Sequence, residues 1–150
     1  MWCPDEAEYD KPVAVLQICH GMIEYIDRYD GFARFMAERG FVVVGNDHLG
    51  HGKSVCSDED LGFFKEKKPG EALAKDAHHL TVLIKKMYPD IPYYLIGHSM
   101  GSFVTRKYIC DYGHELDGVI VMGTGHQPTP VVLGGKLLAN ITKLIKGDRL

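Results

Sequence analysis

Four short apolar runs recur along the chain, and none of them alternates regularly between apolar and polar residues. They are VAVLQICH (13–20), FVVVGNDH (41–48), PYYLIGHS (92–99) and LDGVIVMGTG (116–125). Strands of parallel sheets are buried on both faces, and their sequences read as continuous runs of this kind. The pattern therefore predicts four buried parallel strands.

Helical periodicity marks the segments between these runs. Residues 30–40 place large apolar side chains on one face, residues 71–88 carry an apolar stripe, and residues 100–112 end before a glycine. His78 and His79 lie beside the stripe of 71–88, where we expect them to be solvated or to cap backbone groups. Strands that alternate with helices predict an α/β fold with three layers and a mostly parallel sheet.

The segment 130–150 has a different pattern. Its apolar residues share one helical face, flanked by Lys136, Lys143 and Lys146. Amphipathicity indicates only that one face of the helix is covered. One interpretation is that the helix packs against a partner outside this chain. The other is that residues 130–146 rest on a lipid-like substrate or on a membrane surface.

The charge and the cysteine content argue against a nucleic-acid-binding protein and against a disulfide-bonded secreted protein. The 150 residues suit a single domain, and a formal net charge of −3 gives no electrostatic footprint for nucleic acid, so we expect no nucleic-acid partner. No secretory signal or membrane-spanning run is visible. Cys3, Cys19, Cys56 and Cys110 are widely spaced, which favours buried free thiols over a disulfide framework and predicts a cytoplasmic location.

The sequence Gly97-His98-Ser99-Met100-Gly101 is a G-x-S-x-G motif between a predicted strand and a predicted helix. In this context the motif is typical of a nucleophile elbow, a strained turn that exposes a serine hydroxyl above the sheet. The helix that follows directs its free N–H groups toward the same point. We therefore predict that Ser99 is a catalytic nucleophile.

A second element of such a site follows the first strand. The backbone N–H groups of Met22 and Met100 are the expected oxyanion donors, because folds with this elbow take one donor after the nucleophile and one after a neighbouring strand. We also expect His20, Gly21, His98 and His126 to border the pocket. The role of general base for His126 remains an alternative, but GTGHQP (123–128) holds no carboxylate that could orient it.

His48 and His51, near Asp47, raise the question of a metal. Zinc needs three or four ligands in a tetrahedral array, and the sequence shows no second cluster at a suitable distance. We therefore predict neither a metal nor a cofactor.

Three motifs carry a family resemblance: HGMIEYIDRY (20–29), NDHLGHGKS (46–54) and GHSMGS (97–102). Together they resemble the monoacylglycerol lipase and lysophospholipase branch of the α/β-hydrolase fold, the serine aminopeptidase S33-like group. Tyr25 departs from the histidine that is usual in this family. Arg28 and Tyr29 match the family's Arg-Tyr pair, which implies that they brace the oxyanion loop. Trp2 matches the end of an earlier strand.

The resemblance implies a fold and an activity. The strands would lie in the order 41–48, 13–20, 92–99, 116–125, and the enzyme would hydrolyse carboxylic esters of lipids such as monoacylglycerol or lysophospholipid. The family's triad acid and histidine follow later strands, so we expect residues 1–128 to be the N-terminal half of an α/β-hydrolase domain that lacks the C-terminal strands. Residues 129–150 would begin the helical cap or lid.

Two consequences follow from this interpretation. The chain alone should be inactive, and the edges of its sheet at 41–48 and 116–123 should be bare and prone to associate with other chains. The alternative function is a non-catalytic α/β binding module or a half-domain that another chain completes.

Overall fold

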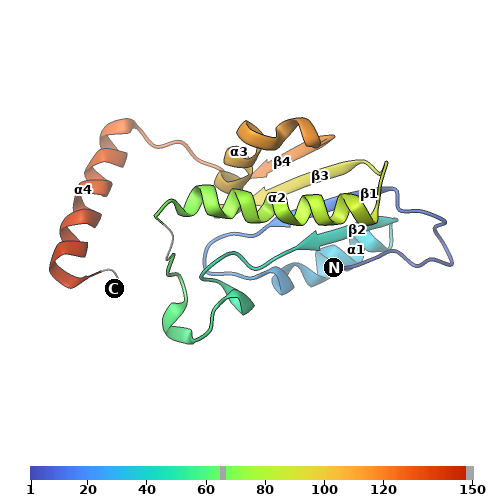
Figure 1. The fold of residues 1–150 in the computed structure, drawn as a ribbon, viewed down its shortest axis with the longest axis horizontal. Coiled ribbons are helices and arrows are strands. Elements are labelled where there is room, and N and C mark those ends of the chain that lie inside the picture. Colours follow the sequence, from blue (N-terminus) through green and yellow to red (C-terminus); the bar gives the residue numbers. More distant parts are fainter. Residues whose placement is uncertain (65–66, 148–150) are drawn as a thin grey trace.

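A parallel four-stranded sheet forms the centre of the molecule. The computed structural model describes residues 1–64 and 67–147. The strands are β1 (Ala14–Cys19), β2 (Phe41–Gly45), β3 (Tyr93–His98) and β4 (Gly118–Met122). They lie in the order β2-β1-β3-β4, and all three pairings are parallel (Figure 1). The predicted strands and their order are confirmed.

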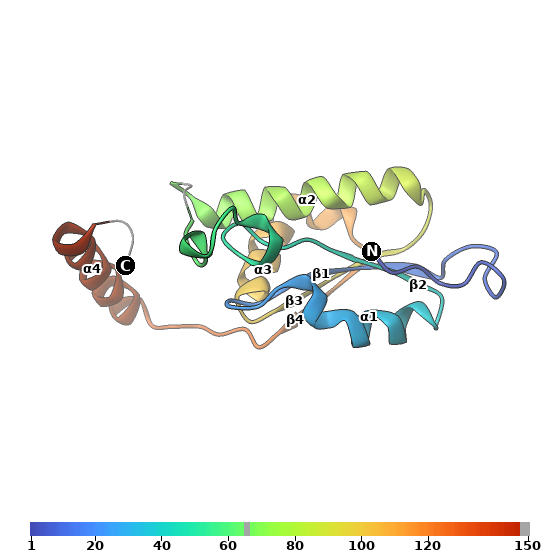
Figure 2. The same ribbon diagram turned by 90° about the horizontal axis from the view of Figure 1, so that it is seen from below.

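Helices cover both faces of the sheet. They are α1 (Asp30–Ala37), α2 (Pro69–Met87) and α3 (Met100–Tyr112). The loops of the described chain also hold short 3₁₀ helices at Ile26–Tyr29 (η1), Gly52–Ser54 (η2), Asp58–Asp60 (η3) and Gly113–Glu115 (η4). Helix α1 lies on one side of the sheet, and α2 and α3 lie on the other (Figure 2). The three layers of the predicted α/β fold are therefore present.

Successive side chains along each strand point to opposite faces of the sheet, so the core has a part on each face. Val15, Tyr93 and Leu95 pack on the side of α2 and α3, whereas Ile18 and Val43 pack on the side of α1. These side chains are almost completely buried. Burial on both faces explains why the strand sequences are continuous apolar runs.

The carboxyl ends of β1 and β3 meet at the centre of the sheet, where Cys19 lies opposite Gly97. The chain continues from β1 to β2 on one side and from β3 to β4 on the other. Open α/β sheets bind ligands in the crevice at such a reversal of direction. The fold therefore places the loop after β1 and the turn after β3 side by side at that crevice.

The two edges of the sheet differ. Trp2 forms an antiparallel bridge with Val43, and each residue donates its N–H to the carbonyl of the other at 2.9 Å. The prediction of a bare edge is therefore wrong at this point of β2. No described strand lies beyond β4, and Ile120, Val121 and Met122 are exposed there.

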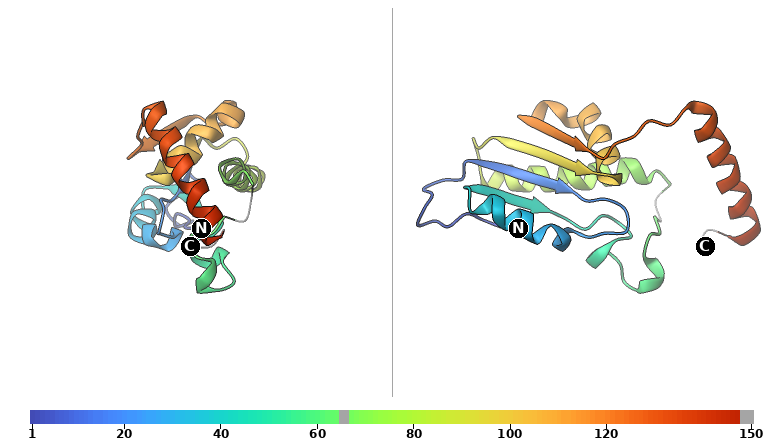
Figure 3. Two further views of the ribbon diagram at one scale, coloured as in Figure 1. Left: turned by 90° about the vertical axis from the view of Figure 1, so that its left-hand side faces the viewer. Right: turned by 180° about the vertical axis from the view of Figure 1, so that it is seen from behind.

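Helix α4 (Thr129–Lys146) extends away from the sheet, to which residues 123–128 connect it (Figure 3). Its apolar side chains are exposed at Val131, Val132, Leu133, Leu137, Leu138, Ile141, Leu144 and Ile145. The predicted amphipathic helix is present, and its apolar face has no covering element within the described part of the chain.

The cysteines are free, as predicted, but only Cys19 is buried. Cys110 is exposed because it lies on the outer face of α3, and Cys3 and Cys56 are exposed as well. The prediction of buried thiols is wrong for these three. Among the described residues, we find no helix with the length and apolar content needed to cross a membrane.

Candidate active site

Ser99 occupies the sharp turn between β3 and α3. Its backbone has φ 53° and ψ −116°, a conformation that residues other than glycine rarely adopt. The Ser99 N–H donates to the carbonyl of Met122 on β4 at 3.0 Å, and its carbonyl accepts from the Ser102 N–H and hydroxyl. These contacts hold the residue in the strained conformation that a nucleophile elbow requires.

The glycines of the motif allow the backbones to approach closely. A β-carbon on Gly97 would lie 2.7 Å from the carbonyl carbon of Gly101, and one on Gly101 would lie 2.6 Å from the carbonyl oxygen of His20. Real β-carbons do not make such contacts, so both positions require glycine. The turn therefore packs directly against the end of β1.

The loop after β1 is held by His20, whose ring is completely buried. The N–H of His48 donates to His20 Nε2 at 2.9 Å, so the ring proton is assigned to Nδ1. Nδ1–H then donates to the carbonyl of Gly21 at 2.7 Å. Because the Gly21–Met22 peptide is trans, the N–H of Met22 points away from the carbonyl that His20 holds.

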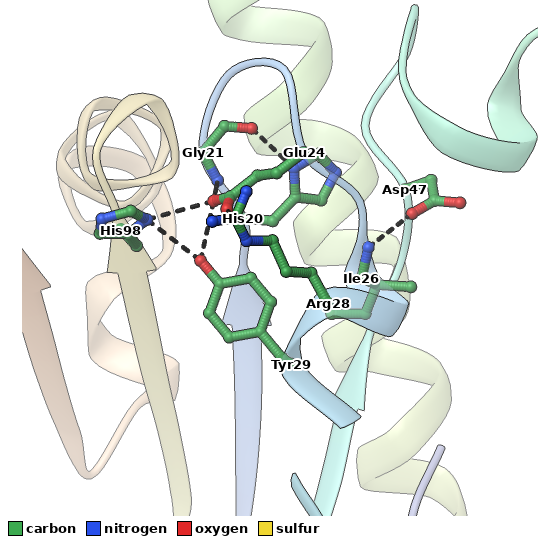
Figure 4. Close-up of polar contacts among 8 residues, drawn as sticks. All are labelled: His20, Gly21, Glu24, Ile26, Arg28, Tyr29, Asp47 and His98. Carbon is green, nitrogen blue, oxygen red and sulfur yellow. Dashed lines mark hydrogen bonds and ion pairs between the residues drawn. The ribbon is translucent and has the colours of Figure 1, made fainter. Parts of the chain in front are cut away.

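Glu24 holds the same loop from its other side (Figure 4). Its side chain is 7% exposed, and its carboxylate accepts a hydrogen bond from the N–H of Gly21. The Tyr29 hydroxyl donates to the same oxygen at 2.8 Å, and Nδ1 of His98 lies 3.1 Å from that oxygen and 3.1 Å from the Tyr29 hydroxyl. One carboxylate thus joins the loop after β1 to the residue that precedes Ser99.

These contacts determine the ionisation of Glu24. Burial raises its pKa, but the hydrogen bonds from His98, Tyr29 and Gly21 lower it by more, so the pKa lies below its ordinary value. Nε of Arg28 lies 3.6 Å from the other carboxylate oxygen. The predicted bracing by Arg28 and Tyr29 is therefore seen, and it acts through Glu24.

The segment 46–54, which follows β2, contacts the loop after β1 and helps to hold it in place. Asp47 accepts from the N–H of Ile26 at 2.8 Å and from the N–H of Lys53 at 2.7 Å. His48 and His51 are buried beside the ring of His20. Burial and the nearby rings of His20 and His51 lower the pKa of His48 to about 3, so its ring is neutral. No set of side chains in the described chain is arranged to hold a metal ion.

Two histidines lie elsewhere than expected. His126 lines a shallow surface groove with Phe103 and Arg106 on the outer side of α3, and within the described residues it makes no hydrogen bond or ion pair. Its expected place in the wall of the Ser99 pocket is not supported. His78 is not solvated: its ring stacks on Tyr112 at 3.7 Å and its Nε2 lies 2.9 Å from a Glu115 carboxylate oxygen.

Of the predicted pocket residues, Gly21 and His98 lie beside Ser99 in the structure. The ring of His20 is buried under the loop after β1 and contacts the carbonyl of Gly21. Sequence reasoning had missed the central position of Glu24. The spacing Gly21-x-x-Glu24 is a usable signal, because a carboxylate three residues after a backbone N–H can turn back and accept from it, as in a capping box.

Comparison with known proteins assigns the family. Residues 10–148 match the family described as serine aminopeptidase, S33. The chain belongs to this family. Among its curated relatives are a monoglyceride lipase homolog of Monkeypox virus, 31% identical over 138 residues, and the monoglyceride lipase of Mus musculus, 27% identical over 139 residues. These alignments cover 87% and 93% of this chain but 47% and 42% of the relatives.

Solved structures of other proteins share the fold of this chain. A thermostable carboxyl esterase from Bacillus coagulans, in complex with glycerol, has 35% identity and a TM-score of 0.79, with 91% of this chain and 44% of the esterase covered. A soluble variant of monoglyceride lipase from Saccharomyces cerevisiae, in complex with a substrate analog, has 18% identity and a TM-score of 0.69 over 97% and 47% of the two chains, and shares the fold. The S33 chain thus spans less than half the length of these proteins.

Proposed function

We propose that Ser99 is the nucleophile of a carboxylic ester hydrolase. The observation that carries this proposal is the strained backbone of Ser99 at the crevice, beside a loop whose peptide orientation is held by His20 and Glu24. The serine hydroxyl would lose its proton to a base while Oγ bonds to the ester carbonyl carbon. The alcohol would leave with a proton, and water would then release the acid from the acyl-enzyme.

The N–H groups of Met22 and Met100 are the proposed oxyanion donors. Met100 opens helix α3, where its N–H is free of helical partners, and the Met22 N–H points away from His20. Two such donors stabilise the negative oxygen of the tetrahedral intermediate, and the loss of one costs about 10²–10³ in kcat.

The proposed substrates are lipid esters of the monoacylglycerol or lysophospholipid type. Support comes from the monoglyceride lipases among the relatives and from the apolar side chains that the oxyanion loop exposes at Met22, Ile23 and Tyr25. Acyl chains gain free energy by covering such surface.

Helix α4 is the proposed contact with the lipid phase and the proposed start of a cap over 129–150, of which residues 148–150 lie outside the described part. Its apolar face is exposed, and Lys136 and Lys143 are exposed on the opposite, polar side. A basic amphipathic helix binds anionic lipid surfaces through both features. Leu137→Glu should abolish sedimentation with phosphatidylserine vesicles, whereas the matched control Leu83→Glu on α2 should not. The cytoplasmic location stays a prediction.

Among the described residues no side chain hydrogen-bonds the Ser99 hydroxyl, and the carboxylates that follow Ser99 in the sequence have partners elsewhere. Asp111 pairs with Lys107, Glu115 contacts His78, and Asp117 accepts from the N–H of Tyr93 at the start of β3. Asp148 lies outside the described residues. The amino end of a parallel strand is opposite the crevice, so Asp117 and its neighbours are at the wrong edge. We therefore propose that residues 1–150 by themselves do not turn over esters at an enzymatic rate.

An alkylboronic acid tests the nucleophile and the oxyanion donors without turnover. Attack by Ser99 gives a tetrahedral boronate that resembles the intermediate. We expect ¹¹B NMR to show a tetrahedral adduct that disappears in Ser99→Ala and persists in Ser57→Ala, together with amide shifts at Met22 and Met100. Absence of the adduct would contradict the nucleophile, and an adduct without those two amide shifts would contradict the donors.

A further inference from the structure

A shallow groove of 550 Å³ lies between α3 and the connection from β4 to α4. Phe103, Arg106 and Cys110 line it from α3, where steps of three and four residues place them on one face of the helix. Residues 125–127 line it from the connection, and Val132 lines it from the first turn of α4. The volume is within the range of small-molecule sites, which is roughly 300–1,000 Å³.

The guanidinium of Arg106 is held in this groove without a negative partner. Its Nη1 donates to the carbonyl of Gly125 at 3.1 Å and to the Thr124 hydroxyl at 3.4 Å. Within residues 1–64 and 67–147, Arg106 pairs with no carboxylate, whereas each of the other arginines lies 2.8–3.9 Å from a carboxylate oxygen. The N–H groups on Nε and Nη2 of Arg106 therefore remain for a ligand, and their planar arrangement suits a carboxylate.

The charge of the groove fits one negative charge. The second cation of its lining, Lys107, lies 2.6 Å from a carboxylate oxygen of Asp111, so its charge is already compensated. The ring of His126 is exposed and offers an N–H donor whichever nitrogen carries the proton. Among the described lining residues, Arg106 thus carries the uncompensated charge. A carboxylate with one charge suits this lining better than a phosphate with two.

Apolar surface adjoins this charge. Phe103 is 51% exposed and Val132 is 39% exposed, and the guanidinium carbon of Arg106 lies 5.8 Å from the centre of the Phe103 ring. A small carboxylate would leave the ring in water. An alkyl chain attached to the carboxylate would cover it and gain free energy by doing so.

We propose that this groove binds a long-chain fatty acid, with the carboxylate on Arg106 and the alkyl chain against Phe103 and Val132. Such an acid is also the class of product that hydrolysis of a lipid ester releases. The binding itself does not depend on the role of Ser99, because neither Ser99 nor the loop after β1 lines the groove.

Dodecanoate, kept below its critical micelle concentration, is the probe, and its binding to the purified chain is followed by NMR. We expect saturable shifts of the Gly125 amide and the Val132 methyl groups. Arg106→Gln should weaken the affinity by about 10–100-fold, the usual contribution of hydrogen bonds to a charged group. Arg34→Gln, at an exposed arginine on α1, should leave the affinity unchanged. Equal affinities of the wild type and Arg106→Gln would overturn the contact with the carboxylate.

The length of the chain tests the apolar part of the groove. Each covered methylene should strengthen binding by roughly 4-fold. Hexanoate should therefore bind more than about 10-fold more weakly than dodecanoate, and Phe103→Ala should reduce this difference. Equal affinities for the two acids would overturn the contact with the alkyl chain.

Two further variants locate the bound acid. Leu137→Glu on the apolar face of α4 and Ser99→Ala at the crevice should both bind dodecanoate as the wild type does. Loss of binding in Leu137→Glu would place the acid on α4, and loss in Ser99→Ala would place it in the crevice. Either result would overturn the site on α3. Absence of dodecanoate binding in a chain whose Ser99 still reacts with a fluorophosphonate would overturn this inference and leave the nucleophile intact.

Discussion

Gly21 and Ser99 touch across the junction of β1 and β3. A β-carbon on Gly21 would lie 3.2 Å from the β-carbon of Ser99 and 2.6 Å from the Glu24 carboxylate oxygen that holds the loop. The loop after β1 and the turn at Ser99 are therefore packed together at a distance that allows no side chain between them.

Substitution at this contact should separate the loop from the elbow. We expect Gly21→Ala to displace Glu24 and to lower the free energy of unfolding by about 1–3 kcal/mol, as overpacked sites do. Gly31→Ala is the control, because nothing lies within 4 Å of the added methyl in helix α1, where alanine should be neutral or stabilising. Urea unfolding of both variants measures the difference, and equal stabilities would contradict the tight contact.

The charge of Glu24 should be visible at Gly21. The pKa of Glu24 lies below its ordinary value, so its stabilising contribution is complete above about pH 4.5 and is lost as the pH falls through the lower folded value. We expect the amide resonance of Gly21 to be constant down to about pH 4.5 and to shift below it. Glu24→Gln should remove this titration, while Glu59→Gln on η3 should retain it. A Gly21 shift that persists in Glu24→Gln would refute the assignment.

The buried histidines should make the fold sensitive to mild acid. The pKa of His48 is lowered to about 3 by burial and by its histidine neighbours, and burial also lowers that of His20. The unfolded chain therefore binds protons below about pH 6.5 that the folded chain excludes. His48 alone should therefore lower the free energy of unfolding by roughly 1 kcal/mol per pH unit between about pH 6.5 and 4.5, a range above the titration of Glu24.

Two variants assign this slope. His48→Gln should reduce the dependence of the unfolding free energy on pH by one proton. His114→Gln should leave it unchanged, because His114 is 78% exposed. The same slope in both variants would show that His48 is not excluded from protonation in the folded state.

The strain at Ser99 should have a measurable cost. Ser99→Ala keeps the left-handed backbone and should change stability little. Ser99→Gly removes the clash of the β-carbon, which stabilises the folded state by roughly 1–2 kcal/mol. Glycine also has more freedom in the unfolded chain, which destabilises the folded state by about 0.5–1 kcal/mol. We therefore expect Ser99→Gly to be more stable than Ser99→Ala by about 1 kcal/mol in urea unfolding. A less stable glycine variant would argue against stored strain.

Much of the fold could be predicted because the sequence patterns that indicate it lie within single short segments. The continuous apolar runs predicted the strands, although β2 ends at Gly45, two residues before Asp47, whose side chain accepts the N–H of Ile26 in the loop after β1. The G-x-S-x-G spacing predicted the sharp turn at Ser99 for a similar reason, since its two glycines are required by contacts within that turn and with the neighbouring strand β1.

Other features depend on partners that are distant in the sequence. His78 meets Glu115 across 37 residues, and Trp2 covers Val43 of β2. His98 reaches Glu24 across 74 residues, which only the pairing of β1 with β3 brings together. The periodicity of a segment does not indicate which distant residues it will pack against, so it predicts a solvated His78.

The most direct test of Ser99 as the nucleophile is mass-spectrometric mapping of a fluorophosphonate adduct on the purified chain. Peptides that contain Ser54, Ser57 and Ser102 provide internal controls in the same digest. The account predicts slow labelling that is confined to Ser99 and absent from Ser99→Ala. Labelling spread evenly among the serines, or an adduct that persists at another residue in Ser99→Ala, would contradict it.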